Sequence, residues 1–160
     1  MSILKIFTNP NPVLRQTATA LDPKVMAQAE LQTLIHDMAQ TMAEADGAGL
    51  AAPQIGQSLR LIAVAVPEGV LIMANPQITK ASWLKEWGEE GCLSVPNIYG
   101  EVKRHKKIRC KFYDAQGQLK KIEAEGMLAR VIQHEIDHLN GILFIDKAKN
   151  IIEQPDVKNN

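Results

Sequence analysis

His134, Glu135 and His138 form the pattern H-E-x-x-H inside a segment that we expect to be helical. Residues four apart on a helix lie on one face, so both imidazole rings can point a nitrogen at one metal ion. Glu135 is then close enough to act on a metal-bound water. The pattern is short and helices also produce it by chance, so two surface histidines around a glutamate remain an alternative for this segment.

A hydrolytic metal site usually has three protein ligands and keeps a fourth position for water. One class of peptidase takes its third ligand from a histidine at the position where Phe144 stands here, and farther downstream the only glutamate is Glu153, in a polar tail. Upstream, Cys92 lies between Gly91 and Ser94. A soft thiolate with two imidazoles suits zinc or ferrous iron, so Cys92 is the candidate third ligand.

A third segment, residues 47–54, is rich in small residues and ends in the amide side chain of Gln54. A dinucleotide-binding loop of the type G-x-G-x-x-G would need glycine where Ala52 stands, and it would follow a strand, whereas this segment follows an expected helix. We therefore reject a phosphate-binding role for it.

Together the three segments resemble the bacterial-type peptide deformylase family. The resemblance rests on Gly-Ala-Gly-Leu-Ala-Ala-Pro-Gln-Ile-Gly at 47–56, Glu-Gly-Cys-Leu-Ser at 90–94 and Gln-His-Glu-Ile-Asp-His-Leu-Asn-Gly at 133–141. Each segment alone is weak to moderate evidence, but the ordered set is highly specific. We expect a single catalytic domain over residues 1–146, followed by a short polar C-terminal tail over residues 147–160.

The resemblance implies metal-dependent hydrolysis of the N-terminal formyl group from formyl-methionine of newly synthesised polypeptides, with release of formate. It implies that Cys92, His134 and His138 bind one divalent metal ion and that Glu135 transfers the proton. Ferrous iron is the implied metal in the cell, and zinc, nickel or cobalt can take its place in samples. A general H-E-x-x-H metallopeptidase and a non-catalytic metal-stabilised module are the alternatives, but neither explains Gln54 or the cysteine segment.

Further site residues follow from the same resemblance. The side-chain amide of Gln54 and the backbone N–H of Leu93 are expected to stabilise the oxyanion of the reaction. Gly49 allows the substrate backbone to approach closely. The candidates for holding the methionine side chain are Ala48, Met127 and Val131.

Two features of this chain depart from the family pattern. Many members have a basic side chain shortly after the cysteine segment, whereas here residues 97–99 are Asn-Ile-Tyr and the nearest arginine is Arg104. Related enzymes often end in a longer, basic helix suited to ribosomal RNA, whereas residues 151–160 are nearly neutral and contain Pro155. We predict at most weak, salt-sensitive ribosome binding, with the basic run 103–107 as its one obvious candidate.

The composition limits the remaining function classes. With 160 residues, 46% of them hydrophobic and 22% charged, the chain can bury a core as one domain. The net charge of zero gives no overall attraction to nucleic acid or membrane. We expect no membrane span, no secretory signal in the first ten residues and no specific nucleic-acid binding. A metal-binding Cys92 must stay reduced, which favours the cytoplasm.

The N-terminal half is expected to begin with a helix and continue as a hairpin. Leucine, isoleucine and methionine recur at helical spacing between residues 31 and 42, between an Asp22-Pro23 start and a Gly47 stop, which predicts a helix over residues 23–45. Residues 59–66 and 70–74 are strand-like runs separated by Pro-Glu-Gly, a hairpin signal.

The C-terminal half contributes further strands and the metal-binding helix. Strands are expected over residues 108–113 and 119–124, the helix over 126–140 with Gly141 ending it, and a short strand over 143–145. Together these elements predict an α+β fold, with mixed or antiparallel sheets packed around a central metal-binding helix and with an N-terminal helix.

A few other residues have a simple structural interpretation. We expect Cys110 in the core, and Trp83 and Trp87, four apart, to cover the core. The basic run 103–107 is interpreted as a solvated loop, with an RNA-facing patch as the alternative. Two roles stay open for Asp137: a solvated helix carboxylate, or a residue behind the metal site that orients a ligand or pairs with Arg130 or another base.

Overall fold

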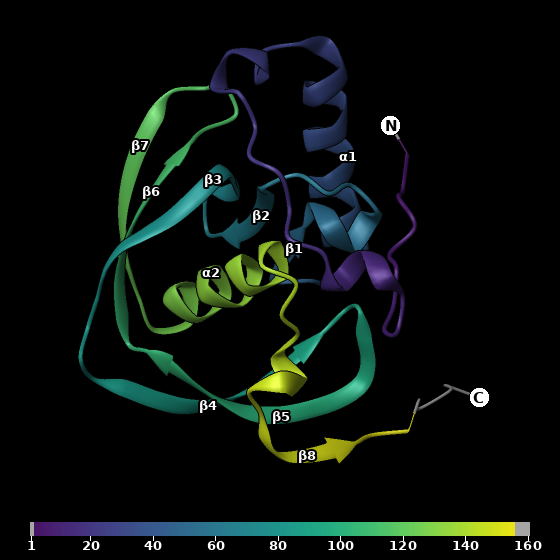
Figure 1. Cartoon of the computed structure of the whole chain (residues 1–160), viewed down its shortest axis with the longest axis vertical. Coiled ribbons are helices and arrows are strands. Elements are labelled where there is room, and N and C mark those ends of the chain that lie inside the picture. The colour runs from purple at the N-terminus through teal and green to yellow at the C-terminus, as the bar shows by residue number, and fades with distance from the viewer. Residues whose placement is uncertain (1, 156–160) are drawn as a thin grey trace.

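A helix, α2 (Gly126–Leu139), lies at the centre of the molecule and contacts strands of two antiparallel sheets (Figure 1). The structure is a computed structural model and describes residues 2–155. A second helix, α1 (Ala29–Glu44), packs against the first strands of the larger sheet. The expected α+β fold, with a central site-bearing helix and an N-terminal helix, is confirmed.

The larger sheet has five strands in the order β1-β2-β3-β6-β7. Its members are β1 (Gly49–Ala51), β2 (Leu61–Val66), β3 (Gly69–Ala81), β6 (Lys107–Tyr113) and β7 (Leu119–Glu125). The β2–β3 and β6–β7 pairs are the expected hairpins, with Val66 opposite Gly69 and Tyr113 opposite Leu119. Strand β3 is longer than predicted, and it bends across β6 at two shifts of register.

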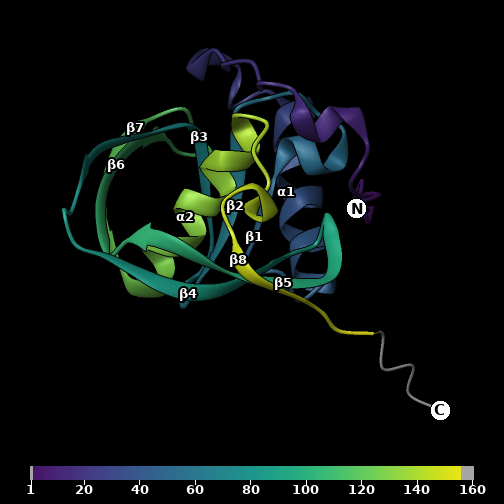
Figure 2. The same cartoon turned by 60° about the horizontal axis from the view of Figure 1, so that its bottom comes forward.

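The smaller sheet has three strands in the order β4-β5-β8 and lies across the other side of α2 (Figure 2). Its members are β4 (Lys85–Cys92), β5 (Val95–His105) and β8 (Lys149–Glu153). None of the three was predicted from the sequence. Strand β8 pairs with β5 and lies within the segment expected to be a polar tail, whose last residues, 156–160, are outside the described part of the chain.

Two apolar layers hold α2 and α1 against the larger sheet. The apolar face of α2, including Ala129, Ile132 and Leu139, packs with Ile62, Val64, Met73 and Phe112 of the sheet. On the other face of the sheet, α1 buries Leu31, Ile35, Met38 and Met42 against Leu61 and Ile72. The predicted core position of Cys110 is confirmed, since it is buried in the first layer.

Two predicted elements have different bounds or a different type. The helix expected over 23–45 is a short 3-10 turn (Pro23–Val25) followed by α1, because the backbone at Gln28 is extended and buried Met26 turns into the core. Residues 143–145 do not form a strand. Leu143 precedes a 3-10 turn (Phe144–Asp146) that contains the other two residues, and the Asp146 carboxylate accepts a hydrogen bond from the backbone N–H of Leu143.

Two further expectations about side chains are wrong. Trp83 does not cover the core, since 97% of it is exposed, and Trp87 is 44% exposed on the outer face of β4. The run 103–107 is not a solvated loop, because it ends β5 and begins β6, and Arg104 within it is buried. Strand alternation explains this, because successive side chains point to opposite faces of the sheet. No helix in residues 2–155 is long and apolar enough to cross a membrane.

Candidate active site

Cys92, His134 and His138 meet at one point between α2 and the end of β4. The Cys92 Sγ lies 3.3 Å from Nε2 of His138, and this nitrogen lies 3.2 Å from Nε2 of His134. The helix places both histidines on one face, and the tight turn that pairs Cys92 with Val95 places the sulfur opposite them. The three ligand atoms all lie within 4.8 Å of one another.

This cluster fits a tetrahedral transition-metal ion. Bonds of 2.0–2.1 Å to nitrogen and 2.3 Å to sulfur place neighbouring ligand atoms about 3.3–3.6 Å apart, close to the observed separations. The Nδ1 of His134 lies 2.9 Å from the Glu90 carboxylate and so carries the proton of the ring. That tautomer leaves the lone pair of Nε2 free to bind a metal.

Glu90 is fixed by two buried arginines. The Nε of Arg104 lies 2.9 Å from one carboxylate oxygen of Glu90, and Nη1 of Arg130 lies 2.9 Å from the same oxygen. Burial alone would raise the pKa of Glu90, but the hydrogen bonds from His134 and Arg104 outweigh it and lower the pKa to about 2. The carboxylate is therefore held ionised behind the histidine.

Asp137 extends the same network along α2. It pairs with Arg104, and its other oxygen lies 2.9 Å from Nζ of Lys147. Of the two roles left open for Asp137, the structure shows the pairing role, with Arg104 and Lys147 as its partners. Arg130 instead bonds Glu90 and the backbone carbonyls of Glu86 and Val102.

Glu135 lies one residue after the first histidine and is buried, yet one oxygen of its carboxylate, Oε2, has no hydrogen-bond partner within residues 2–155. Burial raises the pKa of Glu135 to about 7. Gly49 on β1 faces it so closely that a Cβ at Gly49 would lie 2.4 Å from the other carboxylate oxygen. The carboxylate is therefore positioned by packing instead of by a hydrogen bond.

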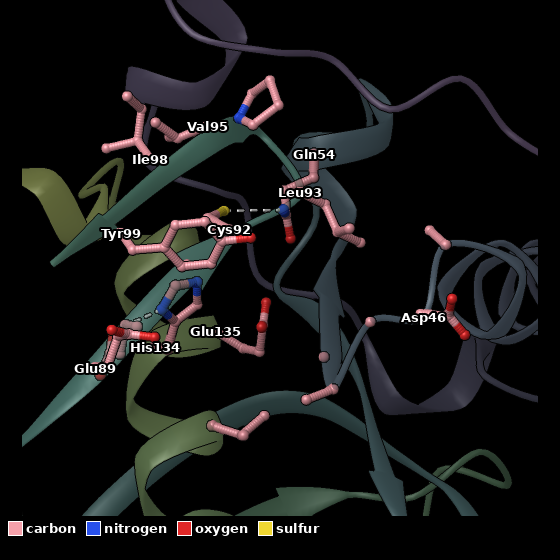
Figure 3. A pocket seen from close by; sticks show the side chains of 18 of the residues that line it. Asp46, Gln54, Glu89, Cys92, Leu93, Val95, Ile98, Tyr99, His134 and Glu135 are labelled. Carbon is pink, nitrogen blue, oxygen red and sulfur yellow. Dashed lines mark hydrogen bonds and ion pairs between the residues drawn. The ribbon is translucent and has the colours of Figure 1, made fainter. Parts of the chain in front are cut away.

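These groups open into a cavity of about 480 Å³ between α2, β1 and the β4–β5 turn. His134 and Glu135 project into it from the helix, toward Cys92 and Gln54 on the facing segments (Figure 3). Nine of the ten expected site residues line the cavity: Ala48, Gly49, Gln54, Cys92, Leu93, Met127, Val131, His134 and Glu135. The tenth, His138, contacts Cys92 and His134 but does not line the cavity. Met127 is 70% exposed and therefore lies at the mouth.

The amide of Gln54 has a defined orientation in the cavity wall. Its Oε1 accepts a hydrogen bond from the backbone N–H of Ala51 at 2.8 Å. The Nε2 therefore points the other way, 3.1 Å from Oγ of Ser94 and 3.6 Å from Sγ of Cys92. The side chain thus presents a donor beside Cys92.

Sequence reasoning missed three contributors to the site. Glu90 belongs to a quoted segment, but its role as the partner of His134 needs the fold of β4 against α2. Arg104 does not reach the cavity, because it is buried between Glu90 and Asp137. Tyr99 of β5 lines the cavity and belongs to the stretch that follows the cysteine segment.

Comparison with known proteins agrees with this geometry. A family model described as polypeptide deformylase matches residues 3–154. The chain belongs to the peptide deformylase family. The peptide deformylase of Pelotomaculum thermopropionicum is 48% identical over 151 residues, which cover 94% of this chain and 95% of that protein.

Solved structures of deformylases also have this fold. The crystal structure of peptide deformylase from Thermotoga maritima matches with a TM-score of 0.88 at 40% identity, covering 93% of this chain and 99% of that one. The Met-Ala-Ser-bound class I type b peptide deformylase from Acinetobacter baumannii matches with a TM-score of 0.87 at 35% identity, covering 91% and 98%. This member of the family is accordingly a hydrolase that removes the formyl group of formyl-methionine.

Proposed function

We propose that this deformylase uses Glu135 as its proton-transfer group, with Cys92, His134 and His138 as the ligands of one divalent metal ion. The observation that carries the proposal is the carboxylate oxygen of Glu135, which is buried, has no partner within the described chain and faces the same cavity as the three ligands. A structural carboxylate at this depth would be expected to have a hydrogen-bond partner.

The metal, when bound, lowers the pKa of a coordinated water toward neutrality and polarises the formyl oxygen. Glu135 accepts a proton from the attacking water through Oε2 and passes it to the nitrogen of the leaving amine. Water and the formamide are thereby converted to formate and the free N-terminus of the peptide. Because Glu135 is not one of the ligands, its loss should leave metal binding intact.

Gln54 and Leu93 supply the donors for the oxyanion in this proposal. The Ala51 hydrogen bond keeps the Nε2 of Gln54 facing the ligand cluster, so the donor is oriented before substrate arrives. Leu93 lines the same cavity, next to Cys92, and its backbone N–H is the second donor that we propose. Oriented donors at developing negative charge are a major source of rate enhancement in acyl transfer.

Formyl-methionyl nascent peptides are the substrates we infer. Ala48, Met127 and Val131 give one part of the cavity an apolar wall for the methionine side chain, and Gly49 lets the peptide backbone approach. The Acinetobacter relative is bound to Met-Ala-Ser, and this supports the binding of a peptide that begins with methionine. We place the reaction in the cytoplasm and in a catalytic domain over residues 1–146, with weak, salt-sensitive ribosome binding at most.

Ferrous iron is the resident metal that we propose. The donor set of one thiolate and two imidazoles also accepts zinc, nickel or cobalt, so affinity alone does not select the working ion. Iron beside the thiolate of Cys92 exposes both to oxidation. We expect the anaerobically loaded iron enzyme to be the more active form. Because of this oxidation it should lose activity in air, whereas the nickel and cobalt forms should keep theirs.

The function is tested with a formyl-Met-Ala-Ser peptide under anaerobic metal loading. The acetylated peptide of the same sequence is the control, and a longer peptide without a formyl group reports internal cleavage. We expect formate release from the formyl peptide alone. Turnover of neither N-blocked peptide at full metal occupancy would overturn the proposal, and internal cleavage would identify a general metallopeptidase instead.

A further inference from the structure

Trp83 is the most exposed large apolar side chain in the described chain. It lies in the connection between β3 and β4 with 97% of its surface in solvent, and Leu84 beside it is 58% exposed. Tryptophan is highly buried on average, so an exposed one needs an explanation. Residues 81–85, Lys103 and His105 line a shallow groove of about 710 Å³ at this place, and none of them lines the cavity of the active site.

The surroundings of Trp83 are basic. On the outer face of the smaller sheet, Lys85 is opposite His105, and Trp87 is opposite Lys103. Lys149 of β8 adds a third amino group, with Nζ 3.6 Å from the centre of the Trp87 ring. Of the described residues that line the groove, none is acidic.

The run 103–107 contributes to this surface only through alternate residues. Lys103 and His105 are on the same side as Lys85, whereas Arg104 points inward to the buried carboxylates. Lys106 is exposed but lies 3.5 Å from Glu86, so part of its charge is compensated. Farther along the same face, Glu89 is opposite Glu101, and Glu101 is in register with Lys149, so the charge of Lys149 is partly compensated. The excess of positive charge is therefore carried by Lys85, Lys103 and His105 around Trp83, in a chain whose net charge is zero.

We propose that this surface, made of Trp83, Lys85, Lys103, His105 and Lys149, binds single-stranded RNA without sequence preference. A base that enters the groove can stack on the free face of Trp83, and stacking is tolerant of sequence because every base has a π face. The phosphates that flank it can reach Lys85 and Lys103, which lie diagonally across neighbouring strands, about 7–8 Å apart.

The shape of the surface favours RNA over an anionic membrane. A protein that inserts aromatic side chains into a lipid surface presents an apolar face, with its basic residues on the polar face. Here Trp83 borders a concave groove, and the lysines come from three neighbouring strands of one sheet. A single-stranded nucleic acid, which is a polyanion with exposed bases, fits this arrangement.

The test is a fluorescence-anisotropy titration of a labelled twelve-nucleotide oligouridine with the metal-loaded enzyme at low salt. Trp83→Ala should weaken binding about tenfold. Lys85→Glu/Lys103→Glu should weaken it further and make the slope of log K against log salt shallower by about 1.4, for two lost phosphate contacts. Lys120→Glu/Lys121→Glu, which makes the same change of charge on exposed lysines of β7, is the matched control and should bind like the parent.

All variants should deformylate a short formyl-methionyl peptide at the parent rate, which shows that they are folded. Three results would overturn the proposal: no binding of the oligouridine by the parent at low salt, equal binding by Trp83→Ala and the parent, or equal losses in the two double variants. Binding of phosphatidylserine vesicles with no binding of the oligouridine would assign the surface to membranes and would also contradict it. None of these outcomes bears on the deformylase reaction.

Discussion

The carboxylate of Glu90 holds the ring of His134, with Oε2 of the glutamate 2.9 Å from Nδ1 of the histidine. The other nitrogen of the ring thereby faces His138 and the metal position. A partner of this kind fixes the tautomer and the orientation of a ligand histidine and raises its basicity. We therefore expect Glu90 to contribute to metal affinity, although it is not one of the proposed ligands.

Replacing Glu90 should weaken metal binding without abolishing it. We expect Glu90→Gln to lower the affinity for zinc or cobalt by about 10–100-fold, because a neutral amide supports the imidazole less well. Competition with a chelator of known affinity measures the change. Glu89→Gln is the matched control, since this neighbour on β4 is exposed. Equal affinities in the two variants would argue against the role of Glu90.

Arg104 should matter for stability through the carboxylates that it neutralises. Arg104→Met leaves Glu90 and Asp137 short of a buried cation, so we expect a loss of about 3–5 kcal/mol in the free energy of unfolding. Urea denaturation of the two proteins measures it. Arg109→Met removes an arginine from an exposed pair with Glu123 and should barely change the midpoint. A small effect of Arg104→Met would mean that Arg130 and Lys147 are sufficient to neutralise Glu90 and Asp137.

Gly49→Ala tests the packing of the proton-transfer group. The added methyl group would lie 2.4 Å from Oε1 of Glu135, so one of the two must move. We expect kcat to fall at least tenfold while the metal content and the unfolding midpoint stay close to those of the parent, because a small misplacement of a catalytic group is costly. Unchanged kcat would show that the carboxylate can shift without consequence.

The two cysteines should behave differently, and the pH dependence of stability reports on Cys110. Burial raises the pKa of its thiol to about 11, whereas an unfolded thiol ionises near the ordinary value of 9.0. Below pH 9 both states keep the proton, and between about pH 9 and 11 only the unfolded state loses it, so the free energy of unfolding falls in this range.

Cys110→Ser removes that ionisation and should therefore lose less of its stability between pH 8 and pH 10.5 than the parent does. Urea denaturation at the two pH values measures the difference, and the lysines and tyrosines that also titrate there are common to both proteins. Cys110→Ser should keep its metal, whereas Cys92→Ser should bind it more weakly. The opposite result would mean that the thiolate ligand has been misassigned.

Local patterns in the sequence are sufficient to predict the site helix and the strands that form the hairpins of the larger sheet. The helix over 126–140 was predicted within one residue, because its apolar periodicity is strong and Gly141 adopts the left-handed conformation that ends it. The hairpins have apolar or alternating strands with clear turn residues between them. The ligand cluster followed from residue types and spacing together with the family resemblance.

The smaller sheet could not be predicted in this way. Strand β4 has the sequence Lys-Glu-Trp-Gly-Glu-Glu-Gly-Cys, in which glycine and glutamate are poor strand formers. It is stabilised by tertiary contacts, because Gly88 lies against the guanidinium of Arg130 and Glu90 faces two arginines. The burial of Arg104 inside a basic run also depends on partners that are distant in sequence.

The central claim is that Glu135 transfers the proton and does not hold the metal. Glu135→Gln keeps the shape of the side chain but removes its ability to accept and return a proton. Measuring metal content and kcat on formyl-Met-Ala-Ser in the same preparation gives the most direct test. We predict full metal occupancy with kcat reduced by about 10²–10⁴-fold. Loss of metal in proportion to the loss of activity, or retention of both, would contradict the claim.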